Sequence, residues 1–523
     1  MPWKQLWAKK PLEKLLSEAE GEGALRRILG PVTLTALGVG AIIGAGIFVT
    51  TGRVAREEAG PAIVVSYAIA GFGCAMAALC YAEFAAMVPV AGSAYTYAYA
   101  TLGELFAWII GWDLVLEYAM SCATVASAWS GHLDEVLQAM FGWRIPTVVA
   151  TDPFSMHGAW INLPAVLVMA GTTAVLVRGI KESATVNAIL VGVKLAVTLL
   201  VIAVGVAYIV PGNWNAIPVE AREVPANPAA KWGLLGLLGL NRWLVPLDDS
   251  VRSSFAPYGL SGMMVGASIV FFSYLGFDSL STHAEEARKP QRDVPIGILT
   301  SLAICTVLYI AVAAVITGLV PYPQINVRAA VAAAFTDLAE NNHSTALRVV
   351  AVLISGGALA GITSVLLVTF LSQSRIFLAM ARDRLLPPRI FGAVHPRYRT
   401  PHLSTMLTGF VVCLTAAFTP IGELQNLVNI GTLMAFIIVC AAVMVLRRRR
   451  PDLHRPFRCP ILYVVAPLGI GMNLLMMLFL PLETWLRLVA WLALGLVLYF
   501  SYGYRQSELG REMANVSTAR DAV

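Results

Sequence analysis

The stretch GVGAIIGAGIFVT, from Gly38 to Thr50, decides the fold. It lies in the first strongly apolar segment and holds four glycines, Gly38, Gly40, Gly44 and Gly46. Each glycine inside a helix costs about 1 kcal/mol relative to alanine, so this segment is easily unwound. The alternative is close packing against another helix, because Gly40 and Gly44 form a GxxxG pair.

The composition around this stretch is that of a polytopic membrane protein. Of the 523 residues, 58% are hydrophobic and only 13% are charged. No cleavage-site pattern precedes the first apolar segment, so we interpret it as a retained span and not as a signal peptide. The cysteines form no CxxC pair and the histidines fall in or beside predicted loops. We therefore expect no disulfide framework, no metal site and no cofactor.

Apolar windows of about 20 residues, the length that crosses a bilayer, predict twelve membrane spans. The spans divide into two sets of five and a final pair, all of them helical. The predicted units are an amphipathic N-terminal segment (1–32), a first repeat (33–210), an external loop (211–258), a second repeat (259–446), the last two spans with a preceding basic loop (447–504), and a tail (505–523).

The distribution of basic residues predicts the orientation. Most of the 37 Lys and Arg residues fall on one side when both termini are placed in the cytoplasm, beneath the plasma (inner) membrane. The basic runs 382–399 and 447–450 are explained by this topology and by anionic lipid headgroups, without nucleic acid. The N-terminal stretch, with Trp3 and Trp7, is predicted to lie along the inner membrane surface, with a free solvated tail as the alternative.

A second interrupted span is predicted from Gly259 to Pro290, GLSGMMVGASIVFFSYLGFDSLSTHAEEARKP. Ser273, Gly276 and Asp278, followed by Ser279, break its apolar run near the middle. Interrupted segments at corresponding positions of two halves indicate an inverted-repeat transporter with a site at the membrane midplane.

The broken ends predict what such a site would bind. The N–H groups of Gly44, Ala45 and Gly46 would lose their helical acceptors and open a positive helix end, which favours a carboxylate. Carbonyl groups freed in the second break would favour an ammonium. These carbonyls are the ones near Phe272, Ser273 and Leu275. A zwitterion fits between the two ends.

Six blocks of sequence resemble the amino acid/polyamine/organocation (APC) superfamily, and within it the bacterial relatives of the cationic amino acid transporters. The blocks are GVGAIIGAGIFV, PVAGSAYTYAY, WDLVLEYA, FFSYLGFDSLSTHAEE, MARDRLLP and RTPHLST. The resemblance implies a LeuT-like fold of five plus five inverted helices with two more, whose first and sixth spans unwind at the midplane. It also implies an α-amino acid substrate, and movement coupled to protons or to exchange.

Carried over by position, the resemblance assigns further site residues. Ile42 and Ile43 would lend carbonyls or packing to the carboxylate site, and Phe272 would be an aromatic gate over the substrate. The eighth-span residues Ile362, Thr363 and Ser364 would face the substrate side chain or the first span.

Lys194 lies within the apolar run NAILVGVKLAVTLLVI. Ionisable groups at membrane depth are costly and therefore mark function. Lys194 resembles the lysine that, in sodium-independent relatives, places its ammonium where sodium-coupled members hold a cation. It could load and release a proton during the cycle, or remain a purely structural cation. The alternative without a functional role is that the Lys194 side chain snorkels, placing its ammonium at the membrane surface.

Carboxylates in the third and sixth spans are the other candidate proton groups. Asp113 and Glu117 are four residues apart and so project from one helix face. In the related family, acids at the positions of Glu117 and Asp278 lie near the binding site. The alternative is that Asp278 caps the following half-helix and Glu117 bonds neighbouring hydroxyls.

These features predict a secondary transporter for neutral L-α-amino acids that works by alternating access and is coupled to protons. A transporter of cationic amino acids and an uncoupled exchanger are the alternatives within transport. A non-transporting amino acid sensor is the alternative outside it. An enzyme is not expected, because neither GxSxG nor HExxH is present. The predicted partners are the substrate, protons and membrane lipids; whether a small single-span protein also binds cannot be read from the sequence.

Overall fold

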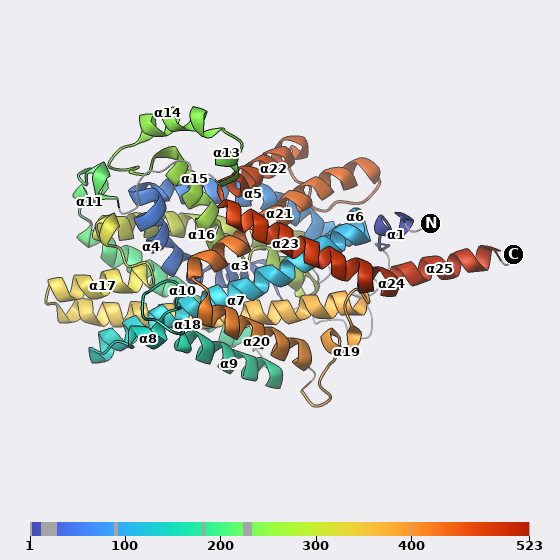
Figure 1. Ribbon diagram of the computed structural model, residues 1–523, viewed down its shortest axis with the longest axis horizontal. Helices are drawn as coiled ribbons and strands as arrows, with labels where there is room; N and C mark the ends of the chain where they lie inside the picture. The colour runs from blue at the N-terminus through green and yellow to red at the C-terminus, as the bar shows by residue number, and fades with distance from the viewer. Residues whose placement is uncertain are drawn as a thin grey trace.

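The computed structural model describes residues 3–11, 29–87, 93–179, 184–222, 233–398 and 400–521, which are predominantly helical and contain no β-strand (Figure 1). Eight helices within these ranges are long and apolar enough to cross a membrane, judged by length and composition. They are Gly46–Met87, Glu104–Phe141, Ile189–Tyr208, Pro290–Leu319, Thr345–Arg382, Ile421–Arg449, Leu462–Phe479 and Leu482–Gln506. Shorter apolar helices are Pro31–Ile42, Leu163–Arg178, Gly259–Tyr274 and His402–Phe418. The count of twelve spans and the repeat symmetry stay predictions.

Local sequence sets where the longest helices begin and end. Helix α7 (Glu104–Phe141) has an acidic residue in its first turn, which the positive end of the helix dipole favours. It ends at Gly142, whose left-handed φ of 66° lets its N–H donate to the Gln138 carbonyl. Helix α18 (Thr345–Arg382) begins where the Ser344 side chain accepts from the Leu347 N–H.

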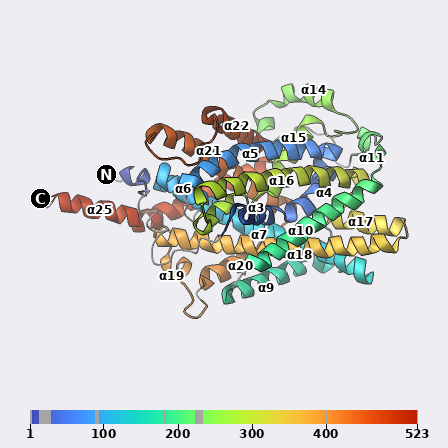
Figure 2. The ribbon, with the colours of Figure 1, turned by 180° about the vertical axis from the view of Figure 1, so that it is seen from behind.

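The long helices pack in two groups. Helix α5 (Ile63–Met87) lies against α16 (Pro290–Leu319), which also contacts α3 (Pro31–Ile42). Helix α7 lies against α18 and against α21 (Ile421–Arg449). Helix α10 (Ala184–Gly205) contacts α3, α16 and α18 and so joins the groups, as the view from behind shows (Figure 2). The outermost layer includes α9 (Leu163–Arg178), packed on α20 (His402–Phe418).

The first predicted break is present. Helix α3 ends at Ile42, and Ile43 adopts extended angles with φ −73° and ψ 108°. The chain then resumes as a π-helical turn, η1 (Gly46–Thr50), followed by α4 (Thr51–Val54). The glycines of α3 also permit close packing, because a Cβ at Gly40 would lie 2.3 Å from Val191 Cγ2.

The second predicted break is also present. Helix α15 (Gly259–Val270) tightens into the 3-10 turn η6 (Phe271–Tyr274), after which Leu275 is extended. Gly276 has φ 108°, a left-handed conformation that only glycine adopts readily. A Cβ at Gly276 would also lie 2.8 Å from the Ala41 carbonyl oxygen, so this glycine lets the second break approach α3. A 3-10 segment, η7 (Asp278–Glu286), completes the span.

Both termini lie at one end of the molecule, and the described N-terminal residues are held there (Figure 1). Gln5 Nε2 donates to Glu104 Oε1 at 3.0 Å and to the Tyr504 carbonyl at 2.8 Å. The Lys10 N–H donates to the Tyr99 carbonyl at 3.2 Å. The free-tail alternative is therefore wrong for residues 3–11, while residues 12–28 of the predicted amphipathic segment lie outside the described residues.

The loop 211–258 and the tail contain short helices. The loop holds α11 (Gly212–Asn215), η5 (Val219–Ala221), α13 (Gly233–Leu237) and α14 (Asn241–Val251). The tail, predicted as residues 505–523 without assigned secondary structure, forms α25 (Glu508–Asp521).

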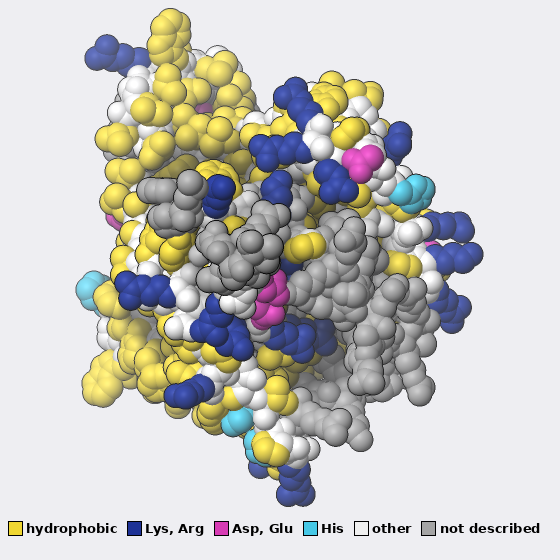
Figure 3. Space-filling view, turned by 90° about the vertical axis from the view of Figure 1, so that its right-hand side faces the viewer, with side chains coloured by type: hydrophobic (Ala, Val, Ile, Leu, Met, Phe, Trp, Pro, Cys, Tyr) yellow, Lys and Arg dark blue, Asp and Glu magenta, His cyan; other side chains and the backbone are white. Residues whose placement is uncertain are grey.

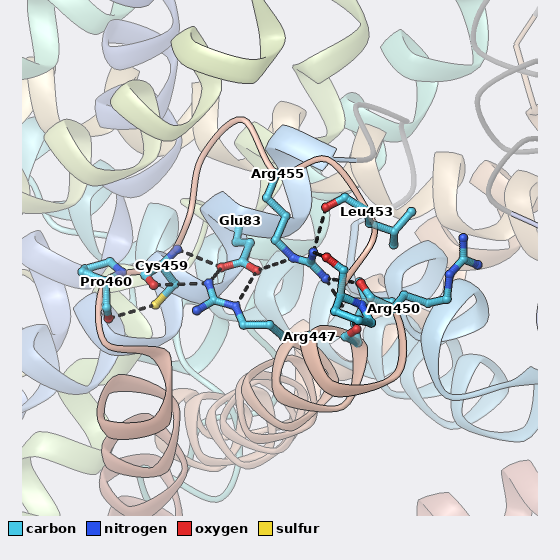
Figure 4. A network of polar contacts seen from close by, with 9 residues as sticks. Glu83, Arg447, Arg450, Leu453, Arg455, Cys459 and Pro460 are labelled. Carbon is cyan, nitrogen blue, oxygen red and sulfur yellow. Dashed lines mark hydrogen bonds and ion pairs between the residues drawn. The ribbon is translucent and has the colours of Figure 1, made fainter.

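A buried carboxylate ties α5 to the loop that follows α21 (Figure 4). Glu83 is fully buried and pairs with the guanidinium groups of Arg447 and Arg455; Arg455 Nε lies 3.3 Å from Glu83 Oε1. The Cys459 N–H donates to Glu83 Oε2 at 2.8 Å. Arg455 is itself buried and donates to the carbonyls of the loop, among them that of Leu453 at 2.8 Å. The basic run predicted from topology alone thus also has a structural role.

We expect Glu83→Ala to destabilise the protein by about 3–5 kcal/mol, because it leaves the buried Arg455 charge without its carboxylate. The measurement is the midpoint of thermal unfolding of the purified protein in detergent. The matched control is Glu423→Ala, which removes the partially exposed carboxylate paired with Arg487 and should cost about 0–1 kcal/mol. Equal midpoints for the two variants would contradict the structural role of Glu83.

Candidate functional site

The two breaks line one cavity in the middle of the helix assembly. Residues from α3, η1, α7, η6 and α18, together with the segment that follows η6, form its wall. The lining residues are Ala41, Ile42, Gly44, Ala45, Gly46, Glu117, Tyr118, Ser121, Val125, Phe272, Leu275, Gly276, Asp278, Val365, Val368, Thr369 and Ser372. Eight sequence-predicted site residues are therefore brought together: Ile42, Gly44, Ala45, Gly46, Glu117, Phe272, Leu275 and Asp278.

The first break brings backbone donors to this wall. Gly44, Ala45 and Gly46 stand at the start of the outer helical segment, where the first N–H groups have no acceptor within their own helix. A Cβ at Gly46 would lie 2.4 Å from Ser273 Cα, so the missing side chain lets the two breaks touch. The arrangement suits an anionic group, because the N–H groups and the helix dipole act in the same direction.

Two side chains donate hydrogen bonds to carbonyl groups that are left unpaired where α3 ends. Lys194 Nζ donates to the Gly40 carbonyl at 2.8 Å, and Lys194 is 1% exposed. The Tyr309 hydroxyl lies 2.9 Å from the Ile42 carbonyl oxygen and 2.7 Å from the Ser273 carbonyl oxygen. A hydroxyl has one hydrogen to donate, so Tyr309 satisfies only one of these carbonyls at a time.

The acids predicted from the sequence lie on or just beyond the cavity wall. Glu117 Oε2 is buried without a hydrogen-bond partner among the described residues, and the Thr432 hydroxyl lies beside the carboxylate. Asp278 Oδ1 accepts from the Gly276 N–H at 3.3 Å, and the Tyr118 hydroxyl lies 3.5 Å from Oδ2. Asp113 is buried against Gly431, outside the lining, and within the described ranges neither of its carboxylate oxygens has a partner.

Besides Asp113, six predicted residues lie outside the cavity lining. The Ser273 side chain faces the Tyr67 hydroxyl at 3.3 Å, and Ile43 is fully buried. Ile362 is also buried, on the turn of α18 that precedes the lining residues, and Lys194 lies beneath the first break. Of the other eighth-span candidates, Thr363 accepts from Trp129 Nε1 at 2.9 Å and Ser364 is buried away from the lining.

Sequence reasoning missed the rest of the wall and the residue that joins the breaks. Tyr309, on α16, carries no signal in the sequence, because nothing distinguishes one tyrosine of an apolar span from another. The missed α18 residues are Val365, Val368, Thr369 and Ser372. Their spacing of three and four follows one helix face, one turn beyond the predicted Ile362. Extending the predicted contact face of this helix by further turns beyond Ile362 would have included them.

Comparison with known proteins gives matches along nearly the whole chain. A family model described as amino acid permease matches residues 29–498. The methylthioribose transporter of Bacillus subtilis (strain 168) is 42% identical over 506 residues, which is 97% of this chain and 99% of that protein. The branched-chain amino acid permease BcaP of the same organism is 40% identical over 508 residues, again 97% and 99%. The vacuolar cationic amino acid transporter 4 of Arabidopsis thaliana is 38% identical over 437 residues, 84% of this chain and 66% of its own.

We expect Gly46→Ala to destabilise the protein by about 1–3 kcal/mol, because the new Cβ would overlap the Ser273 backbone and push the two breaks apart. Thermal unfolding in detergent measures the effect. Gly192→Ala is the control: nothing lies within 4 Å of a Cβ at that helical position, and the change should stabilise by up to about 1 kcal/mol. A Gly46→Ala variant as stable as the control would show that the breaks do not depend on this contact.

Proposed function

The chain belongs to the amino acid permease family of the APC superfamily, and on that premise we propose that it is a proton-coupled secondary transporter of neutral L-α-amino acids. The observation that carries the proposal is the single cavity lined by both interrupted helices. Its start-of-helix N–H groups at Gly44 to Gly46 offer a carboxylate site. Phe272 and Leu275, on the opposite break, lie in the same wall, and their carbonyl groups are the proposed contacts of the α-ammonium. The Phe272 carbonyl also accepts from the Leu275 N–H at 3.3 Å.

The part of the wall beyond the two breaks supports a neutral side chain. Val125, Val365 and Val368 offer aliphatic surface next to Phe272. Aliphatic contact contributes through the apolar area it removes from water, which suits a medium-sized apolar substrate. The similarity to a permease named for branched-chain amino acids agrees with this choice.

A second substrate class is favoured by a specific observation. Glu117 and Asp278 both line the cavity, and one Glu117 oxygen has no partner among the described residues. A cationic side chain reaching these carboxylates would gain a charge-assisted hydrogen bond. Arginine and lysine are therefore the alternative substrates, in agreement with the relatives named as cationic amino acid transporters.

The mechanism that we propose is alternating access in a LeuT-like fold of five plus five inverted helices, with twelve spans in a bacterial inner membrane. The group formed by α3, α5, α15 and α16 rocks against the group formed by α7 and α18, and the cavity between them opens to one side at a time. Lys194 is the proposed coupling group. Its ammonium holds the Gly40 carbonyl at the break, so a change in its protonation would alter how firmly α3 is held. An uncoupled exchanger and a non-transporting sensor remain the alternatives that the assay separates.

Uptake into proteoliposomes tests the function. We expect labelled leucine to accumulate when an inward proton gradient is imposed, and accumulation to stop when an ionophore collapses the gradient. Unlabelled valine, arginine, lysine and methylthioribose, added in turn as competitors, rank the substrate classes. Uptake that occurs only when the vesicles contain amino acid would identify an exchanger. Binding without uptake would identify a sensor. Competition by arginine but not by valine would establish the cationic class of substrate instead.

Lys194→Met is expected to abolish proton-driven accumulation while exchange of internal for external substrate persists, because methionine keeps the apolar stem and removes the ammonium. Loss of the donor to Gly40 should also cost about 1–3 kcal/mol of stability. The comparison variant is Glu117→Gln, which should shift the pH dependence of uptake without abolishing exchange. Proton-driven accumulation by the Lys194 variant would exclude this lysine as the coupling group.

A further inference from the structure

A second groove lies at the end of the molecule that carries both termini. It is formed by the end of α18, by α19 (Pro388–Phe391) with the loop after it, and by η9 (Tyr499–Gly503) with α24 (Tyr504–Gln506). Its wall includes the apolar side chains of Leu378 and Tyr502 and the basic side chains of Arg382, Arg384 and Arg389. One acidic residue, Glu508, also lines it. The groove is separate from the cavity between the two breaks, with which it shares no residue.

The three arginines of this groove have no acidic partner. All three are exposed, and none makes an ion pair or a side-chain hydrogen bond to the residues that the structure describes. Asp383, between two of them in sequence, is already engaged: Lys10 Nζ lies 3.2 Å from Oδ1, and the Tyr95 hydroxyl donates to Oδ2 at 2.6 Å. Glu508 lines the groove but forms no ion pair with any of the three arginines, so three guanidinium groups face one carboxylate and the groove keeps an excess of positive charge.

The position of the groove relative to the membrane distinguishes it from an ordinary basic surface. Two candidate membrane spans, Thr345–Arg382 and Leu482–Gln506, end at this groove, which places it where an apolar span meets the headgroup layer. The adjoining loop exposes apolar side chains as well: Ile390 is 44% exposed and Val394 is 49% exposed. Arginine beside exposed apolar residues is the composition of a segment that lies in the membrane interface.

The described part of this end face is predominantly basic (Figure 3). In the view onto this end, Lys and Arg side chains are spread across the described surface and few acidic side chains appear (Figure 3). Such a face attracts anionic lipids in general, and the groove adds three guanidinium groups around one hollow.

We propose that this groove binds one anionic phospholipid, such as phosphatidylglycerol. Its phosphate would accept hydrogen bonds from the guanidinium groups of Arg382, Arg384 and Arg389, which match phosphate oxygens in a fixed fork geometry. One acyl chain would lie along Leu378 and Tyr502. A freely dissolved anion would find the charge but would leave this apolar wall uncovered, so the lipid fits better than inorganic phosphate.

The bound lipid would act on the end of α18. Asp383, the first residue after α18, holds Tyr95 of α6 (Ser93–Thr101) and Lys10 of the N-terminal segment. A phosphate bound by Arg382 and Arg384, with an acyl chain along Tyr502, would bridge the end of α18 and η9. The lipid would therefore strengthen the contacts that hold this end of the molecule together.

The experiment measures the thermal unfolding midpoint of the full-length protein in detergent, titrated with phosphatidylglycerol, phosphatidylcholine or inorganic phosphate. We expect phosphatidylglycerol alone to raise the midpoint. The triple variant R382Q/R384Q/R389Q should require a roughly 100-fold higher phosphatidylglycerol concentration for the same rise, from the loss of three headgroup contacts. The control R292Q/R448Q/R449Q removes three exposed arginines outside the groove and should respond as the unmodified protein does.

Several outcomes would overturn the proposal. One is an unchanged response of the triple variant; another is an equal rise with phosphatidylcholine. An equal rise with inorganic phosphate would identify a soluble-anion site in place of a lipid site. If the triple variant does not fold, the single variant Arg389→Gln, on the short helix α19, should still need a roughly fivefold higher concentration. An unaltered response of that variant would likewise exclude the groove.

Discussion

A helix that stops inside a membrane must find other partners for its last carbonyl groups, and the structure depends on how this need is met at α3. Where protein or lipid excludes water, each unpaired carbonyl costs several kcal/mol. Lys194 donates to the Gly40 carbonyl and Tyr309 reaches the Ile42 carbonyl. Both donors come from neighbouring helices, α10 and α16, so the break exists only in the assembled protein. The end of α3, the packing of its neighbours and the shape of the cavity therefore depend on the same contacts.

The two breaks support one another. The Tyr309 hydroxyl lies between the carbonyls of Ile42 and Ser273, one from each break. Gly46 and Gly276 let the opposite backbone approach, against Ser273 and Ala41. Sequence alone left two explanations for the glycines, unwinding and close packing. The structure shows that both apply, because Gly40 and Gly44 pack against valines of α10 and α18 while the chain between them and η1 unwinds.

Most of the fold could be predicted because its signals are strong and local. Apolar windows located the helices, and glycines with a mid-span aspartate located both breaks. The resemblance to the APC superfamily is confirmed by the family match. The site was predicted less completely, since side-chain direction depends on helix rotation, which sequence fixes poorly. The α18 assignment, centred on Ile362, missed the cavity face by one turn, and Ser273 turned toward Tyr67. Between Val349 and Ser374 of α18 no charge or break marks the rotation.

The contacts at the two ends of the cavity are unequal, which bears on the proposed cycle. Toward the loops, Arg53 Nη1 donates to Gln425 Oε1 at 3.0 Å, and Gln425 Nε2 donates to Thr50 Oγ1 at 2.8 Å, which joins the first span to α21. Toward the termini, Glu104 alone accepts from Gln5, Tyr99, Tyr499 and Ser507. The Arg53 guanidinium is charged, and hydrogen bonds to a charged group contribute about 1.5–3 kcal/mol each. Of the two sets, only the contacts of Gln425 join the first span to α21, while Glu104 joins α7 to the N-terminal segment and to the segment around η9. In an alternating-access cycle, moving the first span away from α21 would therefore break the Gln425 contacts, and the binding energy of substrate or proton would have to offset that cost.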